Sequence, residues 1–445
     1  MTIEQLENQL DSFDADQRAD ALRQLAQMVR NGRISPVPAG SQVNLHCHTF
    51  FSYNAYGYSP SKFAWLAYKK GLAAAGIVDF DVLDGLNEFL AAGKLLGLKT
   101  CVGMETRVYV PEFADKEINS PGEPGVAYHM GVGFPSADLT GANAQFLLEL
   151  RQTVRQRNES LMQRVNKYLS PVELDYDKDV LPLTPSGNAT ERHLCRAYAS
   201  KAQQVFPNAS DLAGFWSEKL GTADTDSLKL PEGAPLQNML RAKTMKRGGV
   251  GYVQPSQGSF PRMDRTNEFS LAAGAIPTFT WLDGTSPGER QIERLLEVAM
   301  STGVAAINII PDRNYTPGVK NEKLANLYHV VELAQKLNLP VIAGTETNSP
   351  GQKFVDDFKS KELAPLLPTF LRGSYICYAH SVLQQQCGLG YTSQWARNHL
   401  PDAAARNKFF ANVGQTLPPA HEDCLSGFDN NTTPKKINDT LQRLS

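Results

Sequence analysis

Short hydrophobic segments alternate with amphipathic segments along much of this chain. Apolar runs of strand length lie at 42–47, before Asp79, and at 99–110, 275–281, 304–310 and 340–346. Several of them are separated by segments with the 3.6-residue periodicity of helices, as at 321–337. Strands that alternate with helices favour parallel pairing, because a crossover helix returns the chain to the same edge of the sheet. The pattern predicts an α/β fold with a parallel sheet or barrel.

Helix-boundary residues punctuate this pattern. Ser59 followed by Pro60 predicts an N-cap with proline in the first helical turn, and Gly71 is expected to end that helix. Asp84 is expected to cap a helix that runs to about Gly97. The segment Ser286-Pro287-Gly288-Glu289 has the spacing of a capping box. These signals place helices after at least three of the predicted strands.

Three regions lack the alternation. Residues 3–31 have the pattern of one or two amphipathic helices, residues 136–250 are helical and polar, and residues beyond 365 are mostly helical before a polar tail from about 425. The predicted organisation is an N-terminal helical extension (1–34), a β/α barrel (42–135 and 265–365), an inserted helical lobe (136–264) and a C-terminal helical region with a polar tail (366–445).

Composition narrows the classes of function. With 445 residues, 42% hydrophobic and 20% charged, the chain has ample material for a large core. A net charge of −2 gives no strong signal for nucleic acid, and no apolar run approaches the roughly 20 residues that span a bilayer. Six scattered cysteines without a CxxC pair, and a start without a signal-peptide pattern, predict a cytoplasmic protein with reduced thiols. The oligomeric state is not indicated.

The segment Val43-Asn44-Leu45-His46-Cys47-His48-Thr49 carries the strongest chemical signal. On a strand, residues i and i+2 point to the same face, so His46 and His48 can reach one point in space. Two imidazoles that converge at the end of a strand form half of a divalent-metal site.

Other polar residues lie near the ends of predicted strands, where active-site groups gather in parallel β/α folds. Two histidines with two or three carboxylates suit Zn, Mn or Fe, and His46, His48 and Glu105 are the preferred trio because they recur at the ends of the first and third strands. The remaining candidates are Asp79, Asp81, His129, Asp283, Asp312, Arg313 and Glu346.

The spacing of these residues resembles the polymerase and histidinol phosphatase (PHP) superfamily. The resemblance rests on His46-Cys47-His48-Thr49, Asp79-Phe80-Asp81 and Gly103-Met104-Glu105, and it covers 43–135 closely and fainter stretches to about 350. It is greatest to the branch with a helical insertion. The resemblance implies a distorted (β/α)7 TIM-like barrel with metal-dependent phosphoesterase activity.

The family pattern implies nine ligands around three metals, of which this chain keeps part. Similarity places His46, His48, Glu105 and His129 on ligand positions, and Glu346 where the family usually has an aspartate. One metal would be held by His46, His48, Glu105 and Glu346, and a second by Glu105 and His129, with Asp283 as a substitute ligand. The predicted content is one or two divalent ions per chain.

The ligands of a third metal are replaced. Phe80 stands where the family has the histidine of an Asp-His pair, and Asn348 stands in place of the final histidine. The polar ligand that follows the first motif corresponds to Tyr53 or Asn54. Phenylalanine cannot bind a metal, so the third site is expected to be lost.

Basic residues supply candidates for holding an anionic substrate. Arg192 and His193 begin a predicted helix whose first turn could hold a phosphate through backbone N–H groups and the guanidinium. Arg313 follows a predicted strand and could bind a phosphate or carboxylate. The alternative interpretation is that these residues are ordinary surface or helix-start groups.

The leading hypothesis is hydrolysis of a small phosphorylated substrate, a nucleotide or sugar phosphate, by a metal-bound hydroxide. Asp79 or Asp283 would act as ligand or general base, and Arg192 and Arg313 would take the phosphate. One alternative is a mononuclear-metal hydrolase or isomerase that acts on a sugar acid or amide. The other is a barrel that binds metal without catalysis.

Overall fold

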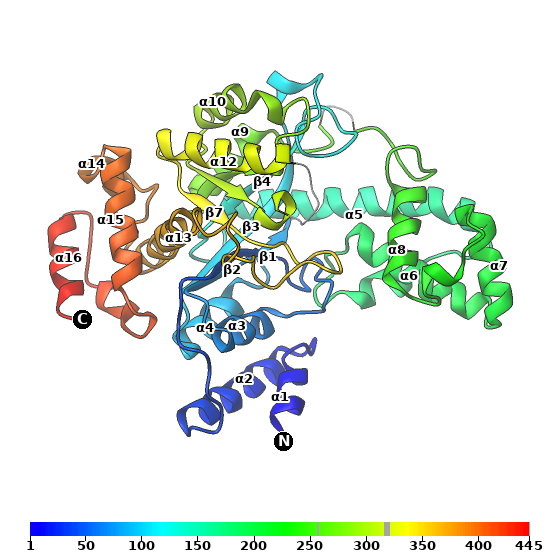
Figure 1. Ribbon diagram of the computed structural model, residues 1–445, viewed down its shortest axis with the longest axis horizontal. Helices are drawn as coiled ribbons and strands as arrows, with labels where there is room; N and C mark the ends of the chain where they lie inside the picture. The colour runs from blue at the N-terminus through cyan, green and yellow to red at the C-terminus, as the bar shows by residue number, and fades with distance from the viewer. Residues whose placement is uncertain (256–257, 316–320, 445) are drawn as a thin grey trace. The chain divides into compact units, whose positions relative to one another are not determined.

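A single seven-stranded sheet organises the first of two compact units in this computed structural model, which describes residues 1–255, 258–315 and 321–444. Its strands follow one another in chain order, so each pairs with its neighbours in sequence (Figure 1). The fold is of the α/β class, as predicted. The strands are β1 (Val43–Cys47), β2 (Ala74–Phe80), β3 (Thr100–Tyr109), β4 (Val126–Val132), β5 (Ile276–Trp281), β6 (Ala306–Ile309) and β7 (Val341–Ala343).

One strand runs against the others. β1, β2 and β3 are mutually parallel, as are β5, β6 and β7, but β4 is antiparallel to both β3 and β5. Between β3 and β4 the chain forms only the short 3-10 helix Pro111–Phe113, and without a crossover helix it returns in the opposite direction. The expected parallel pairing holds for the other six strands but not for β4, and the barrel is distorted, as the resemblance implied.

The two edges of the sheet meet beside the histidine pair. The backbone N–H groups of Thr345 and Glu346 donate to the carbonyl of His46 at 3.1 and 2.8 Å, and the N–H of His48 donates to the carbonyl of Glu346 at 2.8 Å. These bonds join the end of β1 to the residues after β7. The sheet is thus a nearly closed barrel whose seam lies at His46 and His48.

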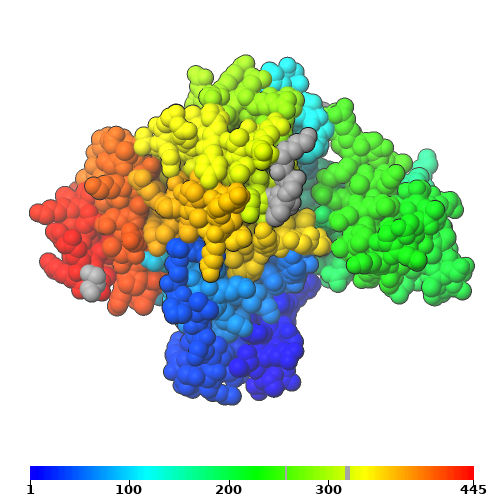
Figure 2. Space-filling view, in the orientation of Figure 1, coloured from blue at the N-terminus to red at the C-terminus, as the bar shows by residue number. Residues whose placement is uncertain are grey.

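Helices cover the barrel and extend it at both ends of the chain. α13 packs against β7 and β1–β3, and α15 packs on α13. Figure 2 shows α12, in yellow, on the face of this unit that is turned to the viewer. The helices of the unit are α1 (Ile3–Gln9), α2 (Ala15–Arg30), α3 (Pro60–Lys69), α4 (Leu86–Leu96), α9 (Met263–Ala272), α10 (Ile292–Ser301), α11 (Pro311–Asn314), α12 (Asn321–Lys336), α13 (Leu367–Cys387), α14 (Gln394–His399), α15 (Ala403–Thr416) and α16 (Pro434–Gln442).

The predicted helix boundaries are confirmed at Ser59 and Gly97 but not at Asp84. The Ser59 hydroxyl accepts the N–H of Lys62 at 2.9 Å and caps α3. Asp84 was expected to cap α4, but the N-cap is Gly85, which makes no side-chain capping bond. Gly97 ends that helix in the left-handed region at φ 72°.

The predicted capping box at 286–289 forms only in part. The Ser286 hydroxyl accepts the N–H of Glu289 at 3.0 Å, as expected. The Glu289 carboxylate turns instead to the loop after β5, where it accepts the N–H groups of Leu282, Asp283 and Gly284 at 2.7, 3.0 and 2.8 Å. Its side chain therefore fixes the end of a barrel strand.

The C-terminal segment is more ordered than the expected polar tail. Beyond 425 the chain forms α16, which Thr433 caps, and the side chains of Ile437 and Leu441 are buried. Their i, i+4 spacing gives the helix one apolar stripe, and α16 packs on α15. Two apolar residues in this polar stretch are thus enough to anchor one short helix.

The second compact unit consists of Phe50–Tyr53 and Gln145–Ser259. It is helical and has a core of its own, which includes Tyr198 and Trp216 at 0% exposure. Its helical segments are α5 (Gly141–Leu169, which begins in the first unit), a π-helix (Tyr176–Val180), a 3-10 turn (Leu181–Leu183), α6 (Glu191–Val205), α7 (Ala209–Leu220), a 3-10 turn (Asp226–Leu228), α8 (Ala234–Leu240) and a π-helix (Arg241–Met245).

Candidate metal centre

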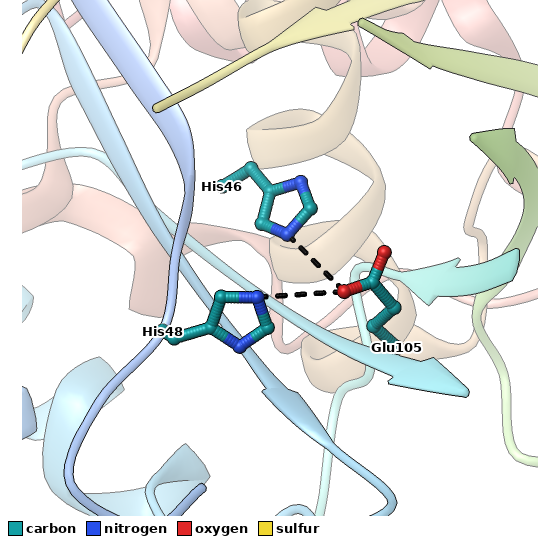
Figure 3. A group of neighbouring side chains, drawn as sticks. All are labelled: His46, His48 and Glu105. Atoms are coloured by element: carbon teal, nitrogen blue, oxygen red, sulfur yellow. Dashed lines mark ion pairs between the residues drawn. The ribbon is translucent and has the colours of Figure 1, made fainter. Parts of the chain in front are cut away.

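His46, His48 and Glu105 converge on one point in the first unit (Figure 3). The Nε2 atoms of His46 and His48 lie 3.7 and 3.4 Å from Oε2 of Glu105. One potential ligand atom from each residue lies within 4.8 Å of the other two, and all three side chains are buried. Alternation along β1 turns both histidines to the same face, and β3 supplies the carboxylate.

The donor atoms fit a divalent ion better than they fit one another. Nε2 of His46 is fully buried, and among the residues that the structure describes it has no hydrogen-bond partner. Ligand atoms that each lie about 2.0–2.2 Å from a tetrahedral Zn²⁺ are roughly 3.3–3.6 Å apart, close to both separations from Glu105. Burial of an unpartnered acceptor is costly, so this arrangement indicates a group that accepts metal.

Asn308 fixes the orientation of the first histidine. Its Oδ1 lies 3.0 Å from Nδ1 of His46, and its Nδ2 donates to the carbonyl of Ile342 at 3.4 Å. With the amide oriented in this way, Nδ1 of His46 carries the proton and Nε2 keeps the lone pair that a metal needs. Asn308 lies on β6 and was not among the residues predicted from the sequence. An asparagine in a buried strand was the available signal.

Charge within the group follows from burial and proximity. Burial opposes ionisation of Glu105, but the two histidines outweigh it and lower the pKa of the carboxyl to about 2. Burial also opposes protonation of His46, yet the charges of Glu105 and Glu346 leave the pKa of His46 raised. A permanent carboxylate beside two imidazoles gives the group the negative charge that attracts a cation.

Phe80 stands beside this group and cannot bind metal. Its ring stacks on His48 with centroids 4.4 Å apart and planes at 26°. Phe80 is the register partner of Glu105 across β2 and β3, so both side chains lie on one face of the sheet. The position that the resemblance assigns to a third-metal histidine is filled by an aromatic ring.

The structure does not bring His129 to this group. Glu105 pairs with Met130 across β3 and β4, so the adjacent His129 points to the opposite face of the sheet. There its Nε2 lies 2.5 Å from Oδ1 of Asn267 on α9, and burial lowers the pKa of the imidazole to about 4. His129 also lies in the middle of β4 and not at a strand end. The pairing register of β3 and β4 therefore separates His129 from Glu105.

Glu346 lies near the group without joining it. Its carboxylate accepts the side-chain N–H of Gln352 at 3.0 Å, and its charge contributes to the raised pKa of His46. Both Glu346 and Thr347 have left-handed backbones, with φ 61° and 56°. For residues with a side chain this conformation costs energy, and here it sits at the barrel seam. A rotation of the carboxylate away from Gln352 would be needed for Glu346 to become a fourth ligand.

The Asp79 carboxylate is hydrogen-bonded to the segment that follows β1. Its two oxygens accept the backbone N–H and the hydroxyl of Thr49 at 2.7 and 2.6 Å. It pairs with Met104 in the β2–β3 register, so it points away from the face that carries Glu105. The structure therefore places Asp79 where it holds the chain after β1, and it does not bring this carboxylate to the metal group.

Asp283 and Arg313 are brought together, but as an ion pair. Oδ2 of Asp283 lies 2.8 Å from Nζ of Lys323 and 3.7 Å from Nε of Arg313. Burial would raise the pKa of Asp283, but bonds from Lys323 and Thr285 outweigh it and the pKa is lowered. A carboxylate held in this way is a weak general base. Arg313 is partly exposed and can still meet an anion.

Arg192 and His193 belong to the second unit. They lie in the first turn of α6, as expected, where Thr190 is the N-cap. Nδ1 of His193 accepts the N–H of Thr190 at 3.0 Å, and burial lowers the pKa of this imidazole to about 3. His193 thus serves as a neutral capping residue, which conflicts with its predicted role in binding an anion. Nη1 of Arg192 bonds the side-chain oxygen of Asn238.

Comparisons with known proteins give only distant likenesses. No family model matches the chain, and no curated protein matches it. Among solved structures, an amidohydrolase from Chromobacterium violaceum with bound sulfate and no metal has a TM-score of 0.48 and 15% identity over 74% of this chain and 96% of its own. A proposed metal-dependent phosphoesterase from Bifidobacterium adolescentis has a TM-score of 0.46 and 17% identity over 75% of this chain and 98% of its own.

Both TM-scores lie below 0.5, so no activity is transferred from these proteins. Among the described residues, no helix is long and apolar enough to span a bilayer.

Proposed function

We propose that this chain is a metal-dependent hydrolase in which His46, His48 and Glu105 hold one divalent ion. The observation that carries the proposal is the convergence of two buried imidazole Nε2 atoms on the Glu105 carboxylate, at 3.7 Å from His46 and 3.4 Å from His48. A divalent ion bound there would polarise the scissile group and lower the pKa of a water toward about 7. Zn, Mn and Fe all suit this donor set.

The residues around the ion have separate tasks in this proposal. Asn308 holds the tautomer of His46, and Glu105 supplies the negative charge. Glu346 is the fourth ligand if its carboxylate leaves Gln352. Arg313 is the proposed anion-binding residue of the barrel unit, with Asp283 holding its guanidinium in place.

The first candidate substrate is a small phosphate monoester, such as a nucleotide or sugar phosphate. Arg192 belongs to the helical unit and stays a candidate for binding phosphate within that unit, while His193 is better explained as a cap. A two-metal clamp on the phosphoryl group would need further ligands beside Glu105. His129 and Asp283, which were the candidates for that task, are engaged elsewhere.

This geometry favours a second candidate, a mononuclear hydrolase of a carboxylic ester or amide. One ion with an open position is sufficient for attack on a carbonyl carbon. The experiment that separates the candidates begins with the purified chain loaded with Zn, Mn or Fe. It measures the release of phosphate from a panel of phosphate monoesters and of carboxylic acid from a matched panel of carboxylic esters and amides. Turnover of either panel that His48→Ala abolishes supports the common proposal. Turnover that persists in His48→Ala contradicts the assignment of this site. If the native chain releases phosphate but no carboxylic acid, the first candidate is selected.

A further inference from the structure

The face of the sheet that carries Glu105 also carries aromatic side chains. Phe80 is the register partner of Glu105 on one side, and Tyr128 is the register partner of Arg107, two residues beyond Glu105 on β3. Paired residues share a face, and so do residues i and i+2 of one strand. Phe80 and Tyr128 therefore lie on the same side of the sheet as the metal group.

The rings form a row that starts at a metal-binding histidine. His48 and Phe80 stack at 4.4 Å, and the centroids of Phe80 and Tyr128 lie 6.2 Å apart with planes at 46°. His48 and Glu105 are buried, whereas Phe80 and Tyr128 are only half-buried. The row thus runs from the buried metal group toward residues that solvent can reach.

The outer end of the row is polar. Nη1 of Arg107 donates to Glu123 at 2.7 Å, and Glu123 also accepts the hydroxyl of Ser120 at 2.5 Å. The guanidinium lies 4.4 Å from the ring of Phe260. A row of aromatic rings that ends at charged side chains suits a flat apolar group that carries a polar substituent at its far end.

We propose that the substrate of this site has a planar aromatic or heteroaromatic ring attached to the group that is hydrolysed. The inference rests on the proposed metal-dependent hydrolase and names its substrate class. Ring centroids at 4.5–7 Å are the separations at which aromatic groups attract one another. A saturated substrate of the same size would cover the rings without that attraction. Phe80, which cannot bind the metal, is then a residue that determines substrate specificity.

Binding of two phosphonates to the metal-loaded, full-length protein tests the inference by calorimetry. Phenylphosphonate and cyclohexylphosphonate present the same anion to the metal and differ in planarity. The native chain should bind the phenyl compound about tenfold more tightly, as expected for aromatic stacking. Phe80→Leu and Tyr128→Leu should each bring the ratio toward one, while Tyr128→Phe should keep it. Tyr328→Leu, on a partly exposed ring of α12, is the matched control and should also keep it.

The outcomes separate the inference from the function on which it rests. Equal affinity for both phosphonates in the native chain overturns the inference and leaves the metal-dependent hydrolase standing. A ratio that persists in both leucine variants also overturns it, because the preference then comes from another surface. The result for Phe80→Leu counts only if the metal content of this variant matches that of the native chain. If it does not match, Tyr128→Leu provides the result, because Tyr128 lies away from His48. Failure of both phosphonates to bind to a chain that has taken up metal overturns the inference, whereas a chain that takes up no metal overturns the proposed function on which the inference rests.

Discussion

At the scale of single residues, the centre is defined by the convergence of two buried imidazoles on one carboxylate. Within the described part of the chain, Nε2 of His46 has no hydrogen bond, at the cost that any buried polar atom carries. Asn308 partners the other nitrogen of His46, so the tautomer is selected by the fold. Phe80 then borders the group with a ring that offers no ligand.

Asn308 should control metal affinity through His46. Asn308→Leu removes the acceptor of the Nδ1 proton, and we expect metal affinity to fall by about 10- to 100-fold, as for other partners of metal-binding histidines. Asn308→Asp keeps an acceptor and should retain affinity near that of the native chain. Competition with a chelating dye measures both. Native affinity in the leucine variant would show that Asn308 does not orient the ligand.

Asp356 should make stability depend on pH. It is buried, and burial together with the charge of Asp312 raises its pKa to about 8 from 3.8. The folded state then holds a proton that the unfolded state releases between these values, so stability falls as the pH rises through this window. The expected loss is about 1.4 kcal/mol per pH unit at its steepest.

Urea unfolding of the native chain and of Asp356→Asn at pH 5, 6 and 7 measures this dependence. The asparagine variant cannot ionise, so the difference in unfolding free energy between the two proteins should shift in its favour as the pH rises. Parallel curves for the two proteins would mean that Asp356 is ionised in the folded state.

At the scale of elements, strand parity decides which predicted residues meet. The alternation in β1 was readable from the sequence, so His46 and His48 were predicted to share a face, and Glu105 was expected at the end of the third strand. The reversal at β4 was not readable, because direction depends on the length and path of a connection. The pairing register of β3 and β4 is why Met130, and not His129, shares a face with Glu105.

Contacts between side chains far apart in the sequence could not be predicted from local sequence patterns either. Asp79 looked like a strand-end ligand, yet both its oxygens are taken by Thr49, which lies 30 residues earlier. Asn308 lies 262 residues from His46. Periodicity and capping residues gave most of the helices and strands, whereas such long-range pairs appear only when the barrel is assembled.

Glu289 should be worth more to stability than its neighbours on the same segment. Its carboxylate satisfies three backbone N–H groups at the end of β5, and Glu289→Ala would leave them buried without an acceptor. We expect a loss of about 3 kcal/mol in unfolding free energy. Glu293→Ala removes an exposed carboxylate of α10 and should cost less than about 1 kcal/mol. Equal losses for the two variants in urea unfolding would contradict this role of Glu289.

At the scale of the whole molecule, the chain has two compact units with separate cores. The proposed metal ligands all belong to the barrel unit, while Arg192 and His193 belong to the helical unit. A ligand that binds one unit stabilises that unit by mass action. The two units should therefore respond separately to a core substitution and to metal.

Calorimetry should resolve this independence. Trp216 is fully buried in the helical unit, and Trp216→Ala should destabilise that unit by about 3–5 kcal/mol. Added Zn²⁺ should raise only the thermal transition of the barrel unit, in the native chain and in the variant alike. A single transition that both changes shift together would contradict the separation.

The most direct test of the account is the metal content of the purified chain, measured by elemental analysis and by anomalous diffraction at His46 and His48. We expect about one equivalent of a divalent transition metal, a single anomalous peak between the two Nε2 atoms and Glu105, and loss of both in His48→Ala. A chain that takes up no metal, or a His48→Ala variant that retains a full equivalent, would contradict the central claim.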